Sequence, residues 1–366
     1  MHSQLSAEHY ISESVFDREQ ERVFRHLWIY ACMRSAVAVD RAFVTRQIGG
    51  LPVLIQNEGG EVRAFENACP HRLMPIQTEA FGQRRMTCPY HGWSFDSDGK
   101  VKAIPMEQSL FAYNTTERSS LRLKRFATAG IGNLIFVNLS EKPLPIEQQF
   151  PPGLIAQLEQ ISGHFGPLSV NANIPTRYNW KLNFENVLDF HHVPFVHPTS
   201  FQPLLRSTPL SQAEPVPVIL PNLNSLADQS FSTSSPMSIQ PWPWHKMVDS
   251  YGAPDTFHNF YLFPNVNFIS IGGLVFLIQQ FSPLSAGRTQ VSFDLCLARE
   301  RQRIAAPAIL QGHLKGEIDV LMEDVKLLEA LQAGLHSGGP RAQHGRYEAR
   351  LMAFARNYLQ LMGETG

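Results

Sequence analysis

Two short segments identify the first domain: Cys69-Pro70-His71 and, after sixteen further residues, Cys88-Pro89-Tyr90-His91-Gly92-Trp93. Two loops therefore each offer one thiol and one imidazole. Four ligands of this mixed kind suit zinc or an iron–sulfur cluster. Zinc sites usually pair like residues within a loop, whereas a [2Fe-2S] cluster can hold two cysteines on one iron and two histidines on the other. The spacing therefore predicts a cluster bound by Cys69, Cys88, His71 and His91.

Short strand-like runs surround the two loops. Pro52–Gln56 and Val62–Glu66 are separated by Asn57–Gly60, which has the composition of a hairpin turn, as does Asp96–Gly99. We expect a small all-β domain over residues 41–145.

The segments on either side of this predicted β domain have a different sequence pattern. Residues 1–40 are expected to form a helical segment that packs with the second domain, because apolar side chains recur there at helical spacing: Val15, Phe16, Val23, Phe24, Leu27 and Trp28. Residues 146–366 mix strand-like and helix-like stretches, including a predicted helix over Ala305–Gln332, so the second domain is expected to be α+β. Pro215–Pro243 is rich in Pro and Ser and is predicted to be irregular.

A second group of ligand-type side chains lies in the segment Asp189-Phe190-His191-His192-Val193-Pro194-Phe195-Val196-His197. Asp189 and His192 are three residues apart, which places them on one face if the segment is helical. Pro194 disfavours helix at the residue before it, so the chain is expected to bend and bring His197 toward His192. These imidazoles could share one metal ion. Taken alone, the segment is equally compatible with core histidines packed near a helix end.

The two motifs together resemble those of the ring-hydroxylating Rieske non-heme iron oxygenases, in particular their catalytic alpha subunit. The Cys-His loops, with the flanking Pro-His-Arg and His-Gly-Trp, resemble the Rieske domain of that family. The segment D-x2-H-x4-H, preceded by Asn-Trp-Lys and Glu-Asn, resembles its mononuclear-iron motif. The resemblance implies an α+β chain in which a small Rieske [2Fe-2S] domain precedes a larger catalytic domain with an antiparallel sheet of the helix-grip type.

The resemblance also implies a third iron ligand far along the chain. Two histidines and one carboxylate would bind Fe(II) and leave positions open for dioxygen and substrate. Asp324 is the predicted carboxylate, because the pattern from Asp324 through Glu329 to Gln332 resembles the family's D-x4-E-x2-Q motif. Glu323 is the alternative, and Glu329 and Gln332 would lie behind the ligands.

Three further residues near the histidines have expected roles. In this family chains form a head-to-tail ring, commonly a trimer, and Asp189 would accept hydrogen bonds from His91 of a neighbouring copy and from His192. Asn186 is predicted either to point into the substrate pocket or to pack as a helix amide. His191 is expected near the metal or at the surface.

The expected activity is that of an O2-dependent oxidoreductase that mono-oxygenates or oxidatively demethylates an aromatic or other small organic substrate. A cis-dihydroxylating alpha subunit is an alternative, and an electron-transfer Rieske protein or a zinc-binding interaction protein are alternatives from other classes. No G-x-G-x-x-G fingerprint follows a strand, so electrons from NAD(P)H are expected to arrive through a separate flavin reductase, with or without a ferredoxin.

Charge and composition indicate which kinds of partner and which cellular location to expect. The formal net charge is -1 and 17% of residues are charged, so the chain lacks the basic field that would favour nucleic acid or an anionic membrane. The first residues show no basic stretch followed by an apolar run, so we expect a cytoplasmic protein. Cys32 and Cys296 sit in apolar surroundings and are interpreted as core residues.

Overall fold

The computed structural model describes residues 3–189, 191–204, 231–338, 342–345 and 348–364. The chain divides into two compact units: unit 1 comprises Met1–Val23 and Pro145–Gly366, and unit 2 comprises Phe24–Leu144. In sequence, the smaller unit is thus inserted into the larger one. Within the described ranges, no helix is long and apolar enough to cross a membrane.

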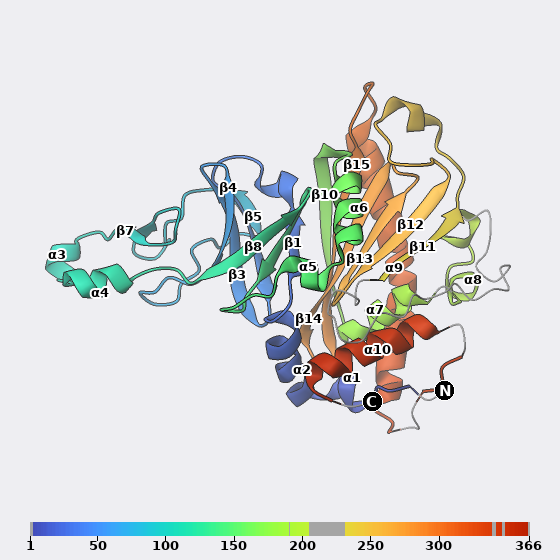
Figure 1. The fold of residues 1–366 in the computed structure, drawn as a ribbon, viewed down its shortest axis with the longest axis horizontal. Helices are drawn as coiled ribbons and strands as arrows, with labels where there is room; N and C mark the ends of the chain where they lie inside the picture. The colour runs from blue at the N-terminus through green and yellow to red at the C-terminus, as the bar shows by residue number, and fades with distance from the viewer. Residues whose placement is uncertain (1–2, 190, 205–230, 339–341, 346–347, 365–366) are drawn as a thin grey trace. The chain divides into compact units, whose positions relative to one another are not determined.

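Unit 2 is built on a seven-stranded antiparallel sheet with strand order β1-β9-β8-β4-β3-β2-β5 (Figure 1). A two-stranded sheet, β6-β7, and two short helices complete it. The elements are β1 (Ile29–Met33), β2 (Ala42–Ile48), β3 (Leu51–Glu58), β4 (Glu61–Glu66), β5 (Phe81–Gln83), β6 (Ser94–Phe95), β7 (Val101–Ala103), α3 (Glu107–Leu110), α4 (Thr115–Ser120), β8 (Arg125–Ile131) and β9 (Leu134–Asn138).

The predicted hairpin of this unit is present. The runs 52–56 and 62–66 lie inside β3 and β4, which pair in register from Val53–Glu66 to Glu58–Glu61. The turn between the two strands contains Gly59 and Gly60 at φ +65° and +94°. Because such angles cost little only for residues without a Cβ, the glycines set the reversal of the chain and hence the register.

The N-terminal segment forms less helix than its spacing predicts. It contains α1 (Glu8–Ile11), α2 (Glu13–Glu19) and a single π-helical turn (Gln20–Phe24). The helical spacing suggested continuation through Trp28, but Ile29–Met33 is a fully buried strand that pairs with β9. Residues 24–40 therefore group with unit 2, whereas the prediction placed them in a helical segment on the second domain.

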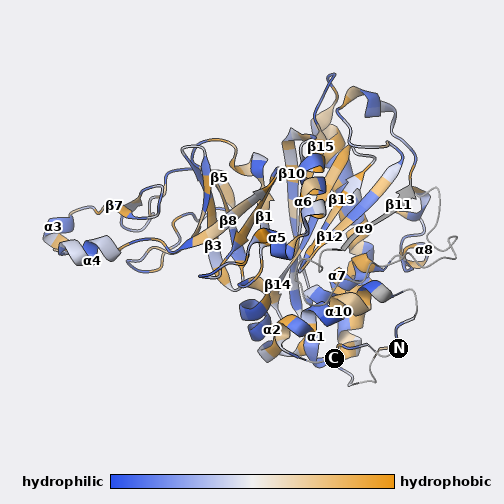
Figure 2. Ribbon diagram, in the orientation of Figure 1, coloured by the Kyte–Doolittle hydropathy of each residue, from blue (hydrophilic) through white to orange (hydrophobic). Residues whose placement is uncertain are grey.

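Unit 1 contains a six-stranded antiparallel sheet with strand order β10-β15-β14-β13-β12-β11 (Figure 1). Its central strands are largely apolar, as Figure 2 shows, and every residue of β13 is buried. The strands are β10 (Phe165–Thr176), β11 (Phe231–Ser238), β12 (Thr256–Leu262), β13 (Val266–Ile271), β14 (Val275–Ser285) and β15 (Arg288–Ala298). The region predicted to be irregular lies partly outside the described residues, and its part at β11 is a strand.

Helices pack against this sheet. The long helix α9 packs against β10 and β15, and α7 packs against β13 and β14. The helices are α5 (Ile146–Gln149), α6 (Pro152–Ser162), α7 (Trp180–Leu188), α8 (Val193–Val196), α9 (Ala306–Leu335) and α10 (Ala349–Met362). The helix predicted over 305–332 is therefore α9, whose apolar stripe is buried against the sheet. The α+β class with an antiparallel sheet is confirmed.

Candidate metal centres

The two Cys-His loops meet at the edge of the unit 2 core. Cys69 and Cys88 are 1% and 2% exposed and belong to a cluster of buried apolar side chains. Each loop is closed by backbone hydrogen bonds: the N–H of Cys69 donates to the carbonyl of Met74, and the N–H of Cys88 donates to that of Trp93. The rings of His71 and His91 lie 4.7 Å apart between centroids. The two cysteines therefore share one buried cluster, and the two histidine rings lie next to each other.

The chemistry of this set fits a [2Fe-2S] cluster. Burial raises the pKa of the Cys69 thiol to about 11, so the thiol stays protonated unless a metal replaces the proton. Burial and the neighbouring His91 lower the pKa of His71, which favours the neutral imidazole that a metal binds. Nδ1 of His71 is buried and has no hydrogen-bond partner. A metal of the cluster would give this buried nitrogen the partner that the protein alone does not supply.

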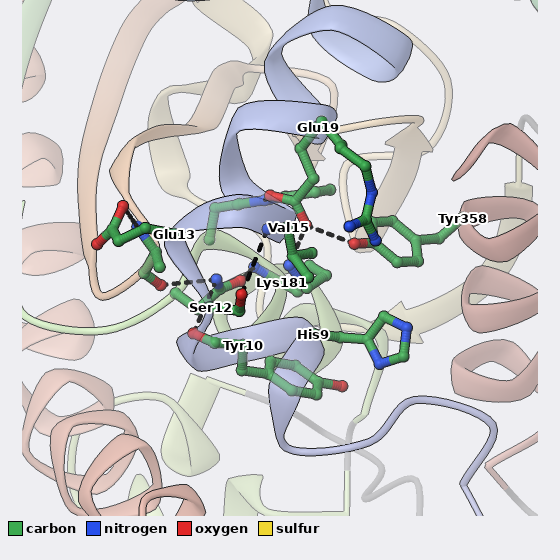
Figure 3. A network of polar contacts seen from close by, with 12 residues as sticks. His9, Tyr10, Ser12, Glu13, Val15, Glu19, Lys181 and Tyr358 are labelled. Carbon is green, nitrogen blue, oxygen red and sulfur yellow. Dashed lines mark hydrogen bonds and ion pairs between the residues drawn. The ribbon is translucent and has the colours of Figure 1, made fainter. Parts of the chain in front are cut away.

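The second constellation begins at the start of α7, which is fixed by buried polar contacts. The carbonyl oxygen of the Asn179 side chain caps the helix by accepting the N–H of Lys181 at 3.0 Å. Glu19 of α2 accepts from Nε1 of Trp180 at 2.9 Å, from the Tyr358 hydroxyl at 2.6 Å and from the Lys181 ammonium (Figure 3). Helices from the two ends of unit 1 thereby set the position of α7.

The far end of α7 differs from the prediction. Asp189 and His192 were expected on one helical face, but α7 ends at Leu188 and α8 begins at Val193. The cause is local, since Oδ1 of Asp189 accepts the backbone N–H of His191 at 2.7 Å and so competes with helix continuation. A short turn of helix, α8, then separates His192 from His197.

The two histidines converge with Asp324 of α9. One ligand-type atom from each of His192, His197 and Asp324 can be chosen so that all three lie within 4.8 Å of one another. Oδ1 of Asp324 lies 3.0 Å from Nε2 of His197 and 3.8 Å from Nε2 of His192. The same Oδ1 is buried and makes no hydrogen bond of acceptable geometry. Two imidazoles and a carboxylate aimed at one point form the donor set of a mononuclear non-heme iron site.

Two family models match the chain. One, the Rieske [2Fe-2S] domain, matches residues 27–114, and the other, the catalytic domain of the ring-hydroxylating alpha subunit, matches residues 168–364. This chain belongs to the ring-hydroxylating alpha subunit family. As a Rieske oxygenase, it is an oxidoreductase whose cofactors are a Rieske [2Fe-2S] cluster and a mononuclear iron.

Relatives of this oxygenase subunit have named activities. The carnitine monooxygenase oxygenase subunit of Escherichia coli K12 is 26% identical over 346 residues, which is 93% of this chain and 86% of that protein. The glycine betaine monooxygenase oxygenase subunit of Pseudomonas aeruginosa PAO1 is 29% identical over 198 residues, covering 54% of this chain and 45% of that protein.

Solved structures share its fold. A quaternary ammonium Rieske monooxygenase in complex with L-carnitine superposes with a TM-score of 0.73 at 22% identity, covering 97% of this chain and 94% of that one. Naphthalene 1,2-dioxygenase of a Rhodococcus species bound to indole gives 0.74 at 19% identity, covering 98% and 94%. At these low sequence identities, the comparison shows a shared fold.

A carboxylate behind the oxygenase's predicted iron ligands orients one of them. Oε2 of Glu323 lies 2.7 Å from Nδ1 of His197 and accepts the Ser200 hydroxyl at 2.6 Å. Such a contact fixes the ring orientation and leaves Nε2 free to bind metal. Sequence reasoning considered Glu323 only as an alternative ligand; its position next to Asp324 carried no signal for this role.

Asp189, Asn186 and His192 line a pocket of about 750 Å³ in unit 1. Oδ2 of Asp189 lies 3.8 Å from Nδ1 of His192, too far for the expected hydrogen bond. Burial would raise the pKa of Asp189, but its polar contacts with His192 and the N–H of His191 outweigh burial and lower it. The ionised carboxylate is therefore favoured beside the histidine.

Three other residues considered in the sequence analysis, His191, Gln332 and Glu329, are not part of the group formed by His192, His197 and Asp324. The side chain of His191 is 43% exposed, and its Nδ1 is 3.6 Å from Oδ1 of Asp189. Gln332 is buried and accepts the N–H of Asn179 at 2.9 Å, so it ties α9 to the start of α7. Glu329 is partly buried and lies close enough to Tyr178 to raise the pKa of that phenol, although burial is the larger cause.

Sequence reasoning missed Glu185 of α7 and Tyr10 of α1, which line the same pocket. The Tyr10 hydroxyl donates to Oε1 of Glu185 at 2.7 Å. Burial raises the pKa of Glu185 to about 7, against the hydrogen bond from Tyr10 and the charge of Lys181, which both lower it. Glu185 lies within the Glu-Asn pair that precedes the histidines, and this was its only signal in the sequence.

Proposed function

We propose that this oxygenase component mono-oxygenates a small quaternary ammonium compound. The relationship to the carnitine monooxygenase subunit, which extends over 93% of this chain, carries the proposal. The aromatic surroundings of the histidines support it. The ring of Phe201 lies 6.4 Å from that of His197, and Phe257 lies 5.4 Å from Phe201. A quaternary nitrogen has no N–H, so aromatic faces are a suitable contact for it.

The same two aromatic rings support a second candidate function, hydroxylation of an aromatic ring. Phe201 and Phe257 would then stack on the substrate instead of facing a cation. Dihydroxylation of such a ring is the further alternative, and naphthalene 1,2-dioxygenase shares the fold.

In our proposal, each predicted site residue has one role. Cys69, His71, Cys88 and His91 would hold the cluster, and His192, His197 and Asp324 would hold the iron. The cluster supplies single electrons, and the iron site supplies dioxygen activation. Glu323 would keep His197 in the tautomer that presents Nε2. Asn186 would contact the substrate from the pocket wall.

Electrons are proposed to come from NAD(P)H through a separate flavin reductase, with or without a ferredoxin. Asp189 would act as a bridge that receives His91 of another copy of this chain, in a homotrimer. The His91 side chain supports this, because it lies at the protein surface next to Tyr90, which is 54% exposed. Asp189 is suited to such a role as an ionised, partly accessible carboxylate beside His192.

Single-turnover product analysis tests the proposal. The holoenzyme, loaded with roughly three irons per chain, would be chemically reduced, mixed with labelled dioxygen and offered L-carnitine, glycine betaine or an aromatic acid. We expect one labelled oxygen atom in a product from a quaternary ammonium compound. An oxygenated product from the aromatic acid alone would favour the second candidate instead.

Asp324→Ala is the matched control for this experiment. It should retain the cluster and about two irons per chain while forming no product. Product formation by this variant at the normal rate would contradict the ligand assignment.

A further inference from the structure

A carboxylate occupies the apolar face of α9 without a structural partner. Buried side chains recur along one face of this helix, among them Leu310, Leu314, Leu321 and Leu328. Glu317 lies three residues after Leu314 and four before Leu321, so it falls on the same face. Burial alone raises the pKa of Glu317 to about 7. Among the described residues, none donates a hydrogen bond to this carboxyl group or forms an ion pair with it. A carboxyl group in such a position calls for an explanation.

Glu317 lies on the same side of α9 as Asp324, the proposed iron ligand. The two residues are seven positions apart, which is close to two full turns of helix. Their Cα atoms are therefore about 10 Å apart along one side of the helix. On the opposite side, Lys315 pairs with Asp319 in solvent, with side chains 76% and 58% exposed. Glu317 thus belongs to the side of α9 that bears the candidate iron site.

Glu317 is accessible even though protein surrounds it. Its side chain is partly exposed, and so are those of His313, one turn before it, and Val320, between it and Asp324. Burial nevertheless perturbs the pKa of Glu317, as expected for a group that faces an enclosed space instead of bulk water. A mononuclear iron site leaves positions open for dioxygen and substrate, so Asp324 borders such a space. The partly exposed side chains form a row from Glu317 to this ligand, along which a substrate can extend.

Aromatic rings lie beyond Glu317, and no positive charge does. The ring of Trp242 meets that of His313 edge-on at 5.0 Å between centroids, and Trp244 stacks on Trp242 at 5.9 Å. Burial lowers the pKa of His313, so its imidazole is neutral and carries no charge that would pair with Glu317. In the described part of the chain, no cation influences the pKa of Glu317. The carboxylate therefore remains available for a positive charge that comes from outside the protein.

We propose that the Glu317 carboxylate supplies the counter-charge for a positively charged group of the substrate. This inference rests on the proposed function and adds the residue that distinguishes a cation from a neutral group of the same shape. The rings of Phe201 and Phe257 suit both kinds of group, whereas a carboxylate in a poorly solvated site attracts only the cation. The cation in turn favours the ionised form of Glu317, because a nearby opposite charge stabilises that form.

Binding of two compounds of the same shape tests this inference without turnover. In the carbon isostere of γ-butyrobetaine, a tert-butyl group replaces the trimethylammonium group, so the two compounds differ only in the charge at that end. Calorimetry on the holoenzyme without oxygen gives the Kd of each. We expect the wild type to bind γ-butyrobetaine about 10-fold or more tightly than the isostere. Glu317→Gln keeps the shape of the side chain and should reduce this ratio to about 3-fold or less, mainly by weakening γ-butyrobetaine.

Asp319→Asn is the matched control, because it removes a carboxylate from the exposed side of the same helix. This variant should keep the wild-type ratio. An unchanged ratio in Glu317→Gln would overturn the inference, and so would equal affinities in the wild type, even if the variant did not fold. In either case, an oxygenated product from γ-butyrobetaine would show that the proposed function still holds. If neither compound bound and only an aromatic acid was oxygenated, the inference and the proposed function would both fail.

Discussion

The buried ion pair between Glu19 and Lys181 offers a sharp test of how unit 1 is held together. Both side chains are fully buried, and Glu19 also accepts from Trp180 and Tyr358. The Lys181 ammonium lies 5.0 to 5.4 Å from the ring centroids of Tyr358, Trp180 and Tyr10. Burial lowers the pKa of Lys181, and the Glu19 carboxylate is the main influence that opposes this.

Glu19→Gln should remove the counter-charge but keep the shape. An ammonium left buried without its partner costs about 3–5 kcal/mol of unfolding free energy. Lys181→Met should cost about as much, because it leaves the buried carboxylate without a counter-charge and only with its hydrogen bonds from Trp180 and Tyr358. The double variant should cost only about 1–2 kcal/mol, because no charge is stranded and the amide introduced by Glu19→Gln can still accept one or two hydrogen bonds. The coupling energy of the cycle is then at least about 4 kcal/mol.

Urea unfolding followed by circular dichroism would measure the four free energies. Lys315→Met on α9 serves as the control, because Lys315 pairs with Asp319 in solvent, with side chains 76% and 58% exposed. Its cost should not exceed about 0.5 kcal/mol. A loss below about 1 kcal/mol in Glu19→Gln, or costs that simply add in the double variant, would refute the reasoning.

Three further outcomes are expected. Asp189→Asn should keep both metals yet slow single-turnover product formation about 100-fold or more, as judged by iron analysis and rapid quenching; a fully active variant would remove the proposed bridge. Glu323→Gln should weaken iron binding about 10- to 100-fold in an iron titration, and unchanged affinity would contradict its orienting role at His197. The pKa of Glu185 is raised to about 7 in the folded protein. The neutral carboxyl group therefore contributes to the unfolding free energy at low pH, and this contribution is lost as the pH rises through about 7. In Glu185→Gln, the unfolding free energy should therefore decrease less between about pH 5 and pH 8 than it does in the wild type. The same decrease in both proteins would show that Glu185 does not cause it.

Local patterns were sufficient to predict several elements of the fold. Gly59 and Gly60 mark the β3–β4 hairpin because few other residues adopt their backbone angles. The apolar spacing along α9 identifies that helix because one of its faces must be buried. The same kind of reasoning failed at Leu27 and Trp28, where pairing of the next residues with β9 outweighed the helical spacing.

The motifs alone indicate which chemistry the protein supports, because the thiol and imidazole of each loop lie within a few residues of one another. The packing of distant elements is what brings Asp324 to His197 and places Glu323 behind that ring. Glu19 and Lys181 are 162 residues apart in the sequence, and no local pattern links them. Such contacts depend on how helices and strands pack, because burial decides which polar groups must find partners and which remain available for a ligand.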